Sequence, residues 1–248
     1  MMPLLDPTTE QFVVDGTGYG FSATRLENLG AAEYTLVCIA ADTSASVAGV
    51  QQSIENCVSK IVQACRLAPR ADHLMLRLVS FNGQLSEVHG FRPLMECHPE
   101  SYTGALPCRG CTALYDASHN AVESVRRYGK QLTQHGFLVN AIVFIITDGD
   151  DNASSLTVQS VKESLGRLRK DEELESLTTI LVGAGIDSQE LTSPLRLFSQ
   201  TVGMDRFIHL DRADPSTLAA LADFVSQHIQ LQSRALGTGT NGPVSLSF

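Results

Sequence analysis

Hydrophobic residues along the chain alternate between continuous apolar runs and segments with helical spacing. Residues 34–41 and 138–146 are almost entirely apolar, which is typical of strands buried on both faces. From Val50 to Cys65, apolar residues recur every three or four positions, and this spacing predicts an amphipathic helix. Strands that alternate with helices indicate a mainly parallel sheet whose crossovers place helices on both faces.

The remaining elements complete a doubly wound α/β fold. The expected sheet has six strands, and the Asn82-Gly83 pair is a hairpin signal that makes one edge strand antiparallel. The predicted strands cover residues 34–41, 73–81, 86–91, 138–146, 177–182 and 206–210. The predicted helices cover residues 50–65, 114–127, 158–173, 191–202 and 216–232.

The residue pattern divides the chain into three segments, which predict its domain organisation. Residues 1–33 form an N-terminal extension, in which 11–15 and 19–25 are expected to pair as a β-hairpin across Gly16-Thr17-Gly18. Residues 34–234 form one α/β domain. Residues 235–248 are rich in Gly, Thr and Ser, and we expect them to form a flexible tail.

Charge and composition narrow the classes of partner. The 248 residues include 18 Lys and Arg against 27 Asp and Glu, a formal net charge of −9. Such a balance argues against non-specific binding to nucleic acid or to anionic membranes. There is no signal-peptide pattern and no apolar run long enough to span a bilayer, and six cysteines are too few for a disulfide framework. We therefore expect a cytoplasmic protein with reduced thiols.

Oxygen-bearing side chains follow the two most apolar strands. Asp42, Ser44 and Ser46 come directly after the first strand, where alternate positions share one side of an extended chain. Asp148 follows the second strand, and Thr112 stands at the entrance of the helix between them. Because ligands of open α/β sheets bind at the carboxyl ends of strands, these side chains predict one site. Carboxylate and hydroxyl oxygens favour Mg²⁺ or Mn²⁺ over Zn²⁺.

This D-x-S-x-S…T…D order resembles the metal-ion-dependent adhesion site of von Willebrand factor type A (VWA) domains. The resemblance covers residues 34–232, and the turn at 183–185 is similar to the glycine-rich turn of that family. Cys111 stands where the family usually has glycine. The N-terminal extension and the tail lie outside the resemblance and suggest a stand-alone member of the prokaryotic or phage type.

The resemblance implies a non-enzymatic protein-binding module. It implies that Ser44, Ser46 and Thr112 contact the cation directly, that Asp42 and Asp148 act partly through water, and that an open coordination position accepts a Glu or Asp from a partner protein. Stand-alone members often serve as adaptors, so an AAA+ ATPase or a stress or defence complex is the expected partner, rather than nucleic acid or a membrane.

Several alternatives stay open at this point. The same acidic edge suits a metal-assisted phosphohydrolase or nuclease, and the domain would also serve as a structural assembly subunit. Cys97, His98, Cys108 and Cys111 offer four soft ligands for zinc, although the adjacent first pair is awkward for tetrahedral geometry. The acidic run 150–152 either raises cation affinity or is a solvated loop.

Overall fold

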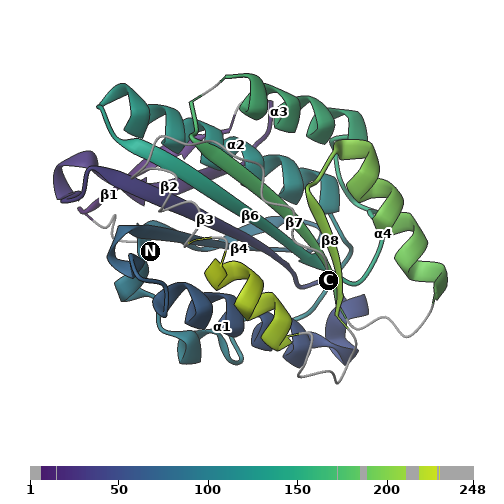
Figure 1. Cartoon of the computed structure of the whole chain (residues 1–248). Helices are drawn as coiled ribbons and strands as arrows, with labels where there is room; N and C mark the ends of the chain where they lie inside the picture. Colours follow the sequence, from purple (N-terminus) through teal and green to yellow (C-terminus); the bar gives the residue numbers. More distant parts are fainter. Residues whose placement is uncertain are drawn as a thin grey trace.

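The computed structural model describes residues 7–14, 16–171, 173–184, 189–210, 218–227 and 229, and its strands form one sheet with helices on both faces (Figure 1). The described sheet has eight strands in the order β1-β2-β5-β4-β3-β6-β7-β8. The strands are β1 Thr9–Val13, β2 Gly20–Thr24, β3 Glu33–Asp42, β4 Leu74–Phe81, β5 Leu85–Pro93, β6 Leu138–Thr147, β7 Ser176–Ala184 and β8 Arg206–Leu210. The α-helices with described bounds are α1 Gln51–Arg66, α2 Leu114–Gln134, α3 Val158–Lys170 and α4 Gln189–Val202.

Five strands (β4, β3, β6, β7 and β8) run parallel, and β5 is antiparallel to β4, as the Asn82-Gly83 signal predicts. The expected N-terminal hairpin is present, because β1 and β2 pair antiparallel. However, β2 also pairs with β5, so the hairpin joins the main sheet and β5 is not an edge strand. The predicted six-stranded sheet therefore lacks β1 and β2. Their place in the sheet depends on β5, which is distant in sequence.

The central strand β3 divides the core into two layers because its side chains alternate between the faces of the sheet. Val37 and Ile39 point to one face and Leu36 and Cys38 to the other, and all four are fully buried. In Figure 1, α1 and the helix over residues 218–227 cover the first face, and α2 and α3 cover the second. Burial on both faces explains why β3 is apolar at nearly every position.

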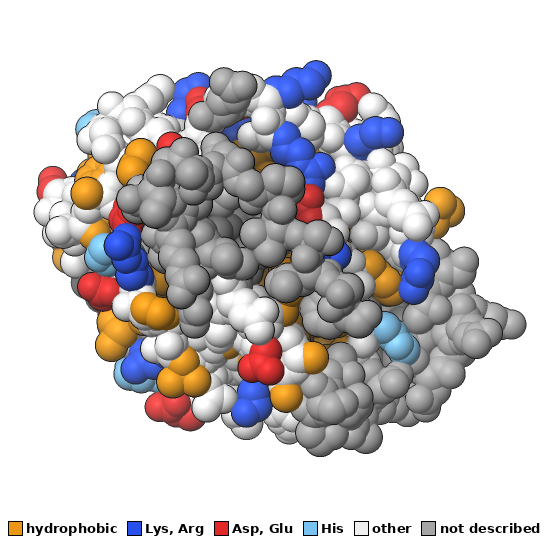
Figure 2. Space-filling model, viewed as in Figure 1, with side chains coloured by type: hydrophobic (Ala, Val, Ile, Leu, Met, Phe, Trp, Pro, Cys, Tyr) orange, Lys and Arg blue, Asp and Glu red, His pale blue; other side chains and the backbone are white. Residues whose placement is uncertain are grey.

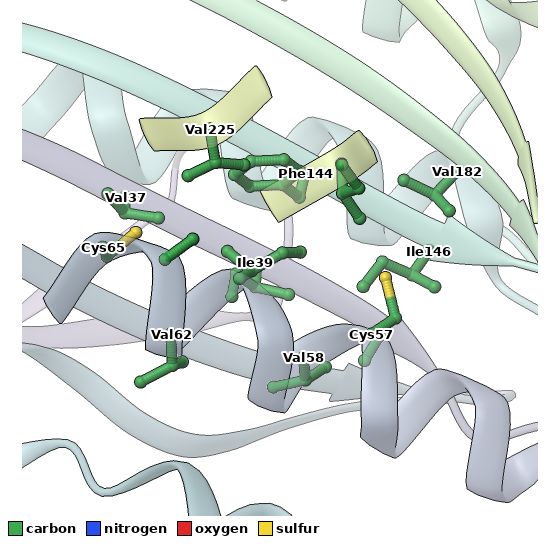
Figure 3. Close-up of a cluster of buried hydrophobic side chains, with 14 of the residues drawn as sticks. Val37, Ile39, Cys57, Val58, Val62, Cys65, Phe144, Ile146, Val182 and Val225 are labelled. Atoms are coloured by element: carbon green, nitrogen blue, oxygen red, sulfur yellow. The ribbon is translucent and has the colours of Figure 1, made fainter. Parts of the chain in front are cut away.

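Figure 3 shows how the first layer is assembled from distant parts of the chain. Cys57, Val58 and Cys65 of α1 belong to the same layer as Phe144 of β6, and Val225 of the 218–227 helix, on the same face of the sheet as α1, completes it. The predicted apolar face of that last helix is thus confirmed over the described residues. The expected ends of that helix, at residues 216 and 232, lie outside the described residues. So do Gly185 of the predicted glycine-rich turn and the predicted tail 235–248.

The other helix predictions hold within a few residues, and the largest difference is at α2. This helix continues to Gln134, beyond the predicted end at residue 127. Tyr128 and Leu132 extend its buried face, and the Tyr128 hydroxyl donates to the Thr24 carbonyl at 2.8 Å. The added turns pack against the N-terminal hairpin, which the sequence analysis treats as separate from the domain.

Charges on the surface are mixed. Acidic and basic side chains are interspersed on the face drawn in Figure 2. Residues of α2 form ion pairs with neighbouring segments, as Lys130 does with Glu173 at 2.8 Å. Among the helices of the described residues, none combines the length and apolarity that crossing a membrane requires.

A buried ion pair fastens the hairpin to the sheet. Arg77 of β4 is fully buried, and its Nε donates to Glu87 of β5 at 2.9 Å, while its Nη2 donates to Asn120 of α2 at 2.9 Å. Glu87 also accepts the backbone amide of Ser22 in β2 at 2.9 Å. The guanidinium lies 5.5 Å from the ring centre of Phe21. One carboxylate therefore holds β2, β4 and β5 together.

Removing the Glu87 carboxylate leaves the Arg77 charge buried without its counter-ion. We expect Glu87→Ala to lower the free energy of unfolding by about 3 kcal/mol, measured by urea denaturation. Glu100→Ala is the matched control, since its side chain is 80% exposed, and it is expected to change stability by less than about 0.5 kcal/mol. Equal effects of the two substitutions would contradict the role given to the ion pair.

Candidate metal centre

The predicted site lies where the carboxyl ends of β3 and β6 meet. Asp42 is the last residue of β3, and Asp148 follows Thr147, the last residue of β6. The strands are adjacent and parallel, and β3 leads to α1 on one face while β6 leads to α3 on the other. The loops after them diverge to opposite faces, which is the position where open α/β sheets bind ligands.

The Asp42 carboxylate is almost completely enclosed, with its residue 1% exposed. Its Oδ1 accepts the backbone amide of Ser44 at 2.7 Å, and its Oδ2 accepts the Thr147 hydroxyl at 2.6 Å. Because these donors come from its own loop and from β6, the carboxylate has one fixed orientation at the junction of the strands.

Ser44, Ser46 and Asp148 form a continuous chain of oxygen atoms. The Oγ atoms of Ser44 and Ser46 are 2.9 Å apart, and the Ser46 hydroxyl donates to Asp148 Oδ1 at 2.9 Å. Ser44 is buried, whereas Ser46 is exposed. The chain of oxygens thus runs from the interior beside Asp42 to the surface, and it joins the loop after β3 to the loop after β6.

Backbone hydrogen bonds hold the Thr112 loop against both of these loops. The Arg109 amide donates to the Thr43 carbonyl at 2.7 Å, and the Ala45 amide donates to the Gly110 carbonyl at 2.9 Å. Thr112 itself donates its amide to Asn152 Oδ1 at 2.7 Å. Thr112 is 3% exposed, and no hydrogen bond engages its hydroxyl within the described part of the chain. Over the described residues, the Thr112 hydroxyl is therefore available to a ligand.

The electrostatics of the site also fit a cation. Burial raises the pKa of Asp42 to about 6 despite its hydrogen bonds from Thr147 and Ser44, and the charge of Asp148 adds to this shift. Burial raises the pKa of Asp148 as well. Among the described residues, no Lys, Arg or His forms an ion pair with either carboxylate. Two neighbouring carboxylates without a counter-charge are costly in a protein interior, and a divalent cation offsets that cost.

Residues beside the five predicted ligands support the site. Thr147 positions Asp42, and Asp151 and Asn152 hold the entrance of α2. Asp151 Oδ1 accepts the Tyr115 amide at 3.2 Å, and Asn152 donates its own amide to the Thr112 carbonyl at 2.9 Å. The acidic run therefore includes loop-fixing residues, while Asp150 is exposed. A polar residue within a few positions of a strand end is the only sequence signal for such roles.

Glu55 is a further supporting residue. It lies buried on α1, and its carboxylate accepts the amide of Gly104 at 2.9 Å and that of Leu106 at 3.3 Å. These bonds anchor the segment that leads to Cys108 and Thr112, so α1 fixes the start of the loop.

The four proposed zinc ligands do not converge. The Cys97 thiol is buried and lies 3.8 Å from the Pro93 carbonyl, the Cys108 thiol lies 3.7 Å from the Leu106 carbonyl, and Cys111 is exposed. His98 pairs with Glu100 on the surface at 3.9 Å. Over the described residues, no group of three or more His, Cys, Asp or Glu side chains is arranged to hold a metal ion. Cys97, Cys108 and Cys111 are free thiols, in agreement with the expectation of reduced cysteines.

No protein-family model matches the sequence, and no curated protein matches it either. Solved structures do match. A D319A mutant of the PilB minor pilin from Streptococcus sanguinis aligns over 92% of this chain and 68% of its own, with a TM-score of 0.58 and 13% identity. An aerotolerance-related membrane protein from Bacteroides fragilis aligns over 79% of this chain and 99% of its own, with a TM-score of 0.53 and 16% identity.

A von Willebrand factor type A protein from Catenulispora acidiphila matches with a TM-score of 0.51 and 15% identity, over 85% of this chain and 45% of that one. The chain has a VWA-like fold. This confirms the predicted architecture of a mostly parallel sheet flanked by helices. Within the VWA-like fold, the five predicted ligands are placed as described above, at the carboxyl ends of β3 and β6 and in the loop before α2.

The raised pKa of Asp42 predicts a pH dependence of the metal-free chain. The folded carboxyl has a pKa of about 6 against a reference value of 3.8, so between these pH values the folded state binds more protons than the unfolded state. The free energy of unfolding should therefore fall as the pH rises through this window, by on the order of 3 kcal/mol from this group. Urea denaturation in EDTA measures it.

Asp42→Asn keeps an oxygen for the Ser44 amide and removes the titration, so its pH slope should be shallower. Saturating Mg²⁺ should likewise flatten the slope of the unmodified chain, because binding favours the ionised carboxylate. If the free energy of unfolding falls equally steeply with pH for Asp42→Asn and for the unmodified chain in EDTA, the Asp42 carboxyl is not the source of the pH dependence.

Proposed function

We propose that this chain is a metal-dependent protein-binding module that captures an acidic side chain of a partner protein. The observation that carries the proposal is the chain of oxygens Ser44–Ser46–Asp148 beside the buried, uncompensated Asp42. The resemblance of the motif to the adhesion site of VWA domains and the VWA-like fold support the same assignment.

The donor set selects the type of cation. Asp42, Ser44, Ser46, Thr112 and Asp148 offer only oxygen, which suits Mg²⁺ or Mn²⁺, whereas Zn²⁺ favours nitrogen and sulfur. Asp42 is held by Thr147 and Ser44, so it contributes charge in a fixed direction. The hydroxyls of Ser44, Ser46 and Thr112 contribute oxygen without charge. A bound divalent cation would supply positive charge and a free coordination position at the surface.

The same charge count indicates what the site would capture. Two carboxylates neutralise a divalent cation, and three neutral hydroxyls leave it electrophilic toward an anionic oxygen. Ser46 is exposed, so this end of the oxygen chain is open to a partner. A chain with net charge −9 repels acidic proteins at long range, and a cation at this point makes local contact with a Glu or Asp favourable. The cation therefore confers specificity for a carboxylate.

The biological setting follows only from the resemblance. An adaptor role toward an AAA+ ATPase or a stress or defence complex, and a cytoplasmic location, stay predictions. The proposal itself requires no catalytic group, and Asp148 and Asp42 act in it as ligands.

Thr112 offers the most selective test of the metal site. Thr112→Val removes one hydroxyl and keeps the side-chain volume, so we expect Mn²⁺ affinity to fall at least about tenfold in calorimetry. Asp42→Asn should abolish detectable binding, because it removes one of the two charges. Thr103→Val is the matched control, since Thr103 is exposed outside the site. Failure of the unmodified chain to bind either Mg²⁺ or Mn²⁺ would overturn the proposal.

Partner capture is tested separately. The immobilised chain is exposed to a native lysate in Mg²⁺ or in EDTA, and the Glu and Asp residues of the captured protein are replaced by Gln and Asn. Capture that needs Mg²⁺ and is lost on one such replacement is the expected result. Capture unchanged by EDTA contradicts the proposal.

A third assay addresses the enzymatic alternative. Turnover of a generic phosphoester by the pure chain with Mn²⁺, abolished in Asp148→Asn, would favour a phosphohydrolase instead of a binding module.

A further inference from the structure

The loop that carries Thr112 also carries a pair of cysteines three positions apart, Cys108 and Cys111. Cys111 is exposed and Cys108 is half-buried, whereas Cys38, Cys57, Cys65 and Cys97 are all buried. The proposed function uses neither thiol of this pair. These are therefore the two cysteines that a small oxidant in solution reaches first, and their spacing is that of redox-active dithiols.

The backbone between the two cysteines changes direction at a glycine. The chain bends at Gly110, whose φ is 77°. Glycine adopts a positive φ without strain, so Gly110 lets the chain change direction between the two cysteines. A disulfide joins residues whose Cα atoms are about 4.4–6.8 Å apart, so its formation requires Cys108 and Cys111 to come within that range.

The two residues between the cysteines are those that bind the loop to the candidate metal centre. Arg109 donates its amide to Thr43, and Gly110 accepts the amide of Ala45. Burial raises the pKa of the Cys108 thiol, and the charges of Asp42, Glu55 and Asp148 add to this shift, so the thiol lies near the same carboxylates.

We propose that Cys108 and Cys111 form a reversible disulfide on exposure to a peroxide, and that this bond loosens the Thr112 loop from the loop after β3. The exposed Cys111 sulfur attacks hydrogen peroxide and breaks its O–O bond, which yields a sulfenic acid and water. The Cys108 sulfur then displaces the sulfenic oxygen as a second water. Two thiols lose two hydrogens and two electrons, and the peroxide is reduced.

Closing this small ring changes the backbone angles of Arg109 and Gly110, because the Cys108 thiol now lies toward the Leu106 carbonyl at 3.7 Å and must turn toward Cys111. Both hydrogen bonds to Thr43 and Ala45 depend on those angles. In the reduced chain these two hydrogen bonds hold the Thr112 loop against the loop after β3, and in the oxidised chain they are lost. The effect on metal binding rests on the proposed function; the disulfide and the lost hydrogen bonds do not.

Peptide mapping of the full chain tests the bond. The reduced chain is treated with hydrogen peroxide, its remaining thiols are blocked, and it is digested with trypsin. Trypsin cuts after Arg109, so the peptides bearing Cys108 and Cys111 stay joined only through a disulfide. We expect a joined pair that dithiothreitol separates. Cys97 shares the peptide of Cys108, so the Cys97→Ala chain must give the same joined pair, and Cys111→Ser must give none.

Two further readouts test the consequence. In hydrogen exchange, the amides of Ala45 and Arg109 should exchange at least about tenfold faster in the oxidised chain, as expected for lost hydrogen bonds. In calorimetry, oxidation should lower Mn²⁺ affinity several-fold, and Cys111→Ser should bind Mn²⁺ equally before and after peroxide.

Peptides that never join, or a bond that leaves both amides as protected as before, would overturn this inference. If the reduced chain binds no Mn²⁺, the proposed function fails, and peptide mapping and hydrogen exchange still decide the redox proposal.

Discussion

The candidate centre depends on one electrostatic constraint, the burial of the Asp42 carboxylate at the end of the central strand without a basic partner among the described residues. Hydrogen bonds from Thr147 and Ser44 fix the direction of the carboxylate but do not neutralise it. The surrounding loops are arranged around this charge. The oxygen chain through Ser46 to Asp148 and the backbone bonds of the Thr112 loop bring neutral and acidic oxygens to the same point.

Much of this arrangement is predictable from the sequence because two independent patterns agree. Apolar runs buried on both faces locate β3 and β6, and parallel strands bring their carboxyl ends to one edge of the sheet. Asp42 and Asp148 therefore had to be neighbours once the strands were assigned. Thr112 lies in a loop, and its place is predicted from the start of the helix that follows it. The resemblance of the motif then implies that its hydroxyl contacts the cation directly.

The supporting residues were not predictable for a physical reason. Thr147 directly follows the predicted strand 138–146, and its hydroxyl has a role only because Asp42 lies on the adjacent strand. Likewise Glu55 is one acidic residue on an otherwise amphipathic helix, and its carboxylate is explained only by the amides of a segment far along the chain. The prediction of a six-stranded sheet was wrong for a similar reason, because no local sequence pattern indicates that β2 pairs with β5.

That pairing has a consequence for the order in which the chain folds. Ser22 of β2 and Glu87 of β5 are 65 positions apart, so the β1–β2 hairpin, which precedes β5 in the chain, has no docking partner until the β4–β5 pair exists. Contacts of such long range form late in folding, since a long loop must close before they stabilise anything. We therefore expect β1 and β2, which precede the other strands of the sheet in the chain, to be among the last to join it.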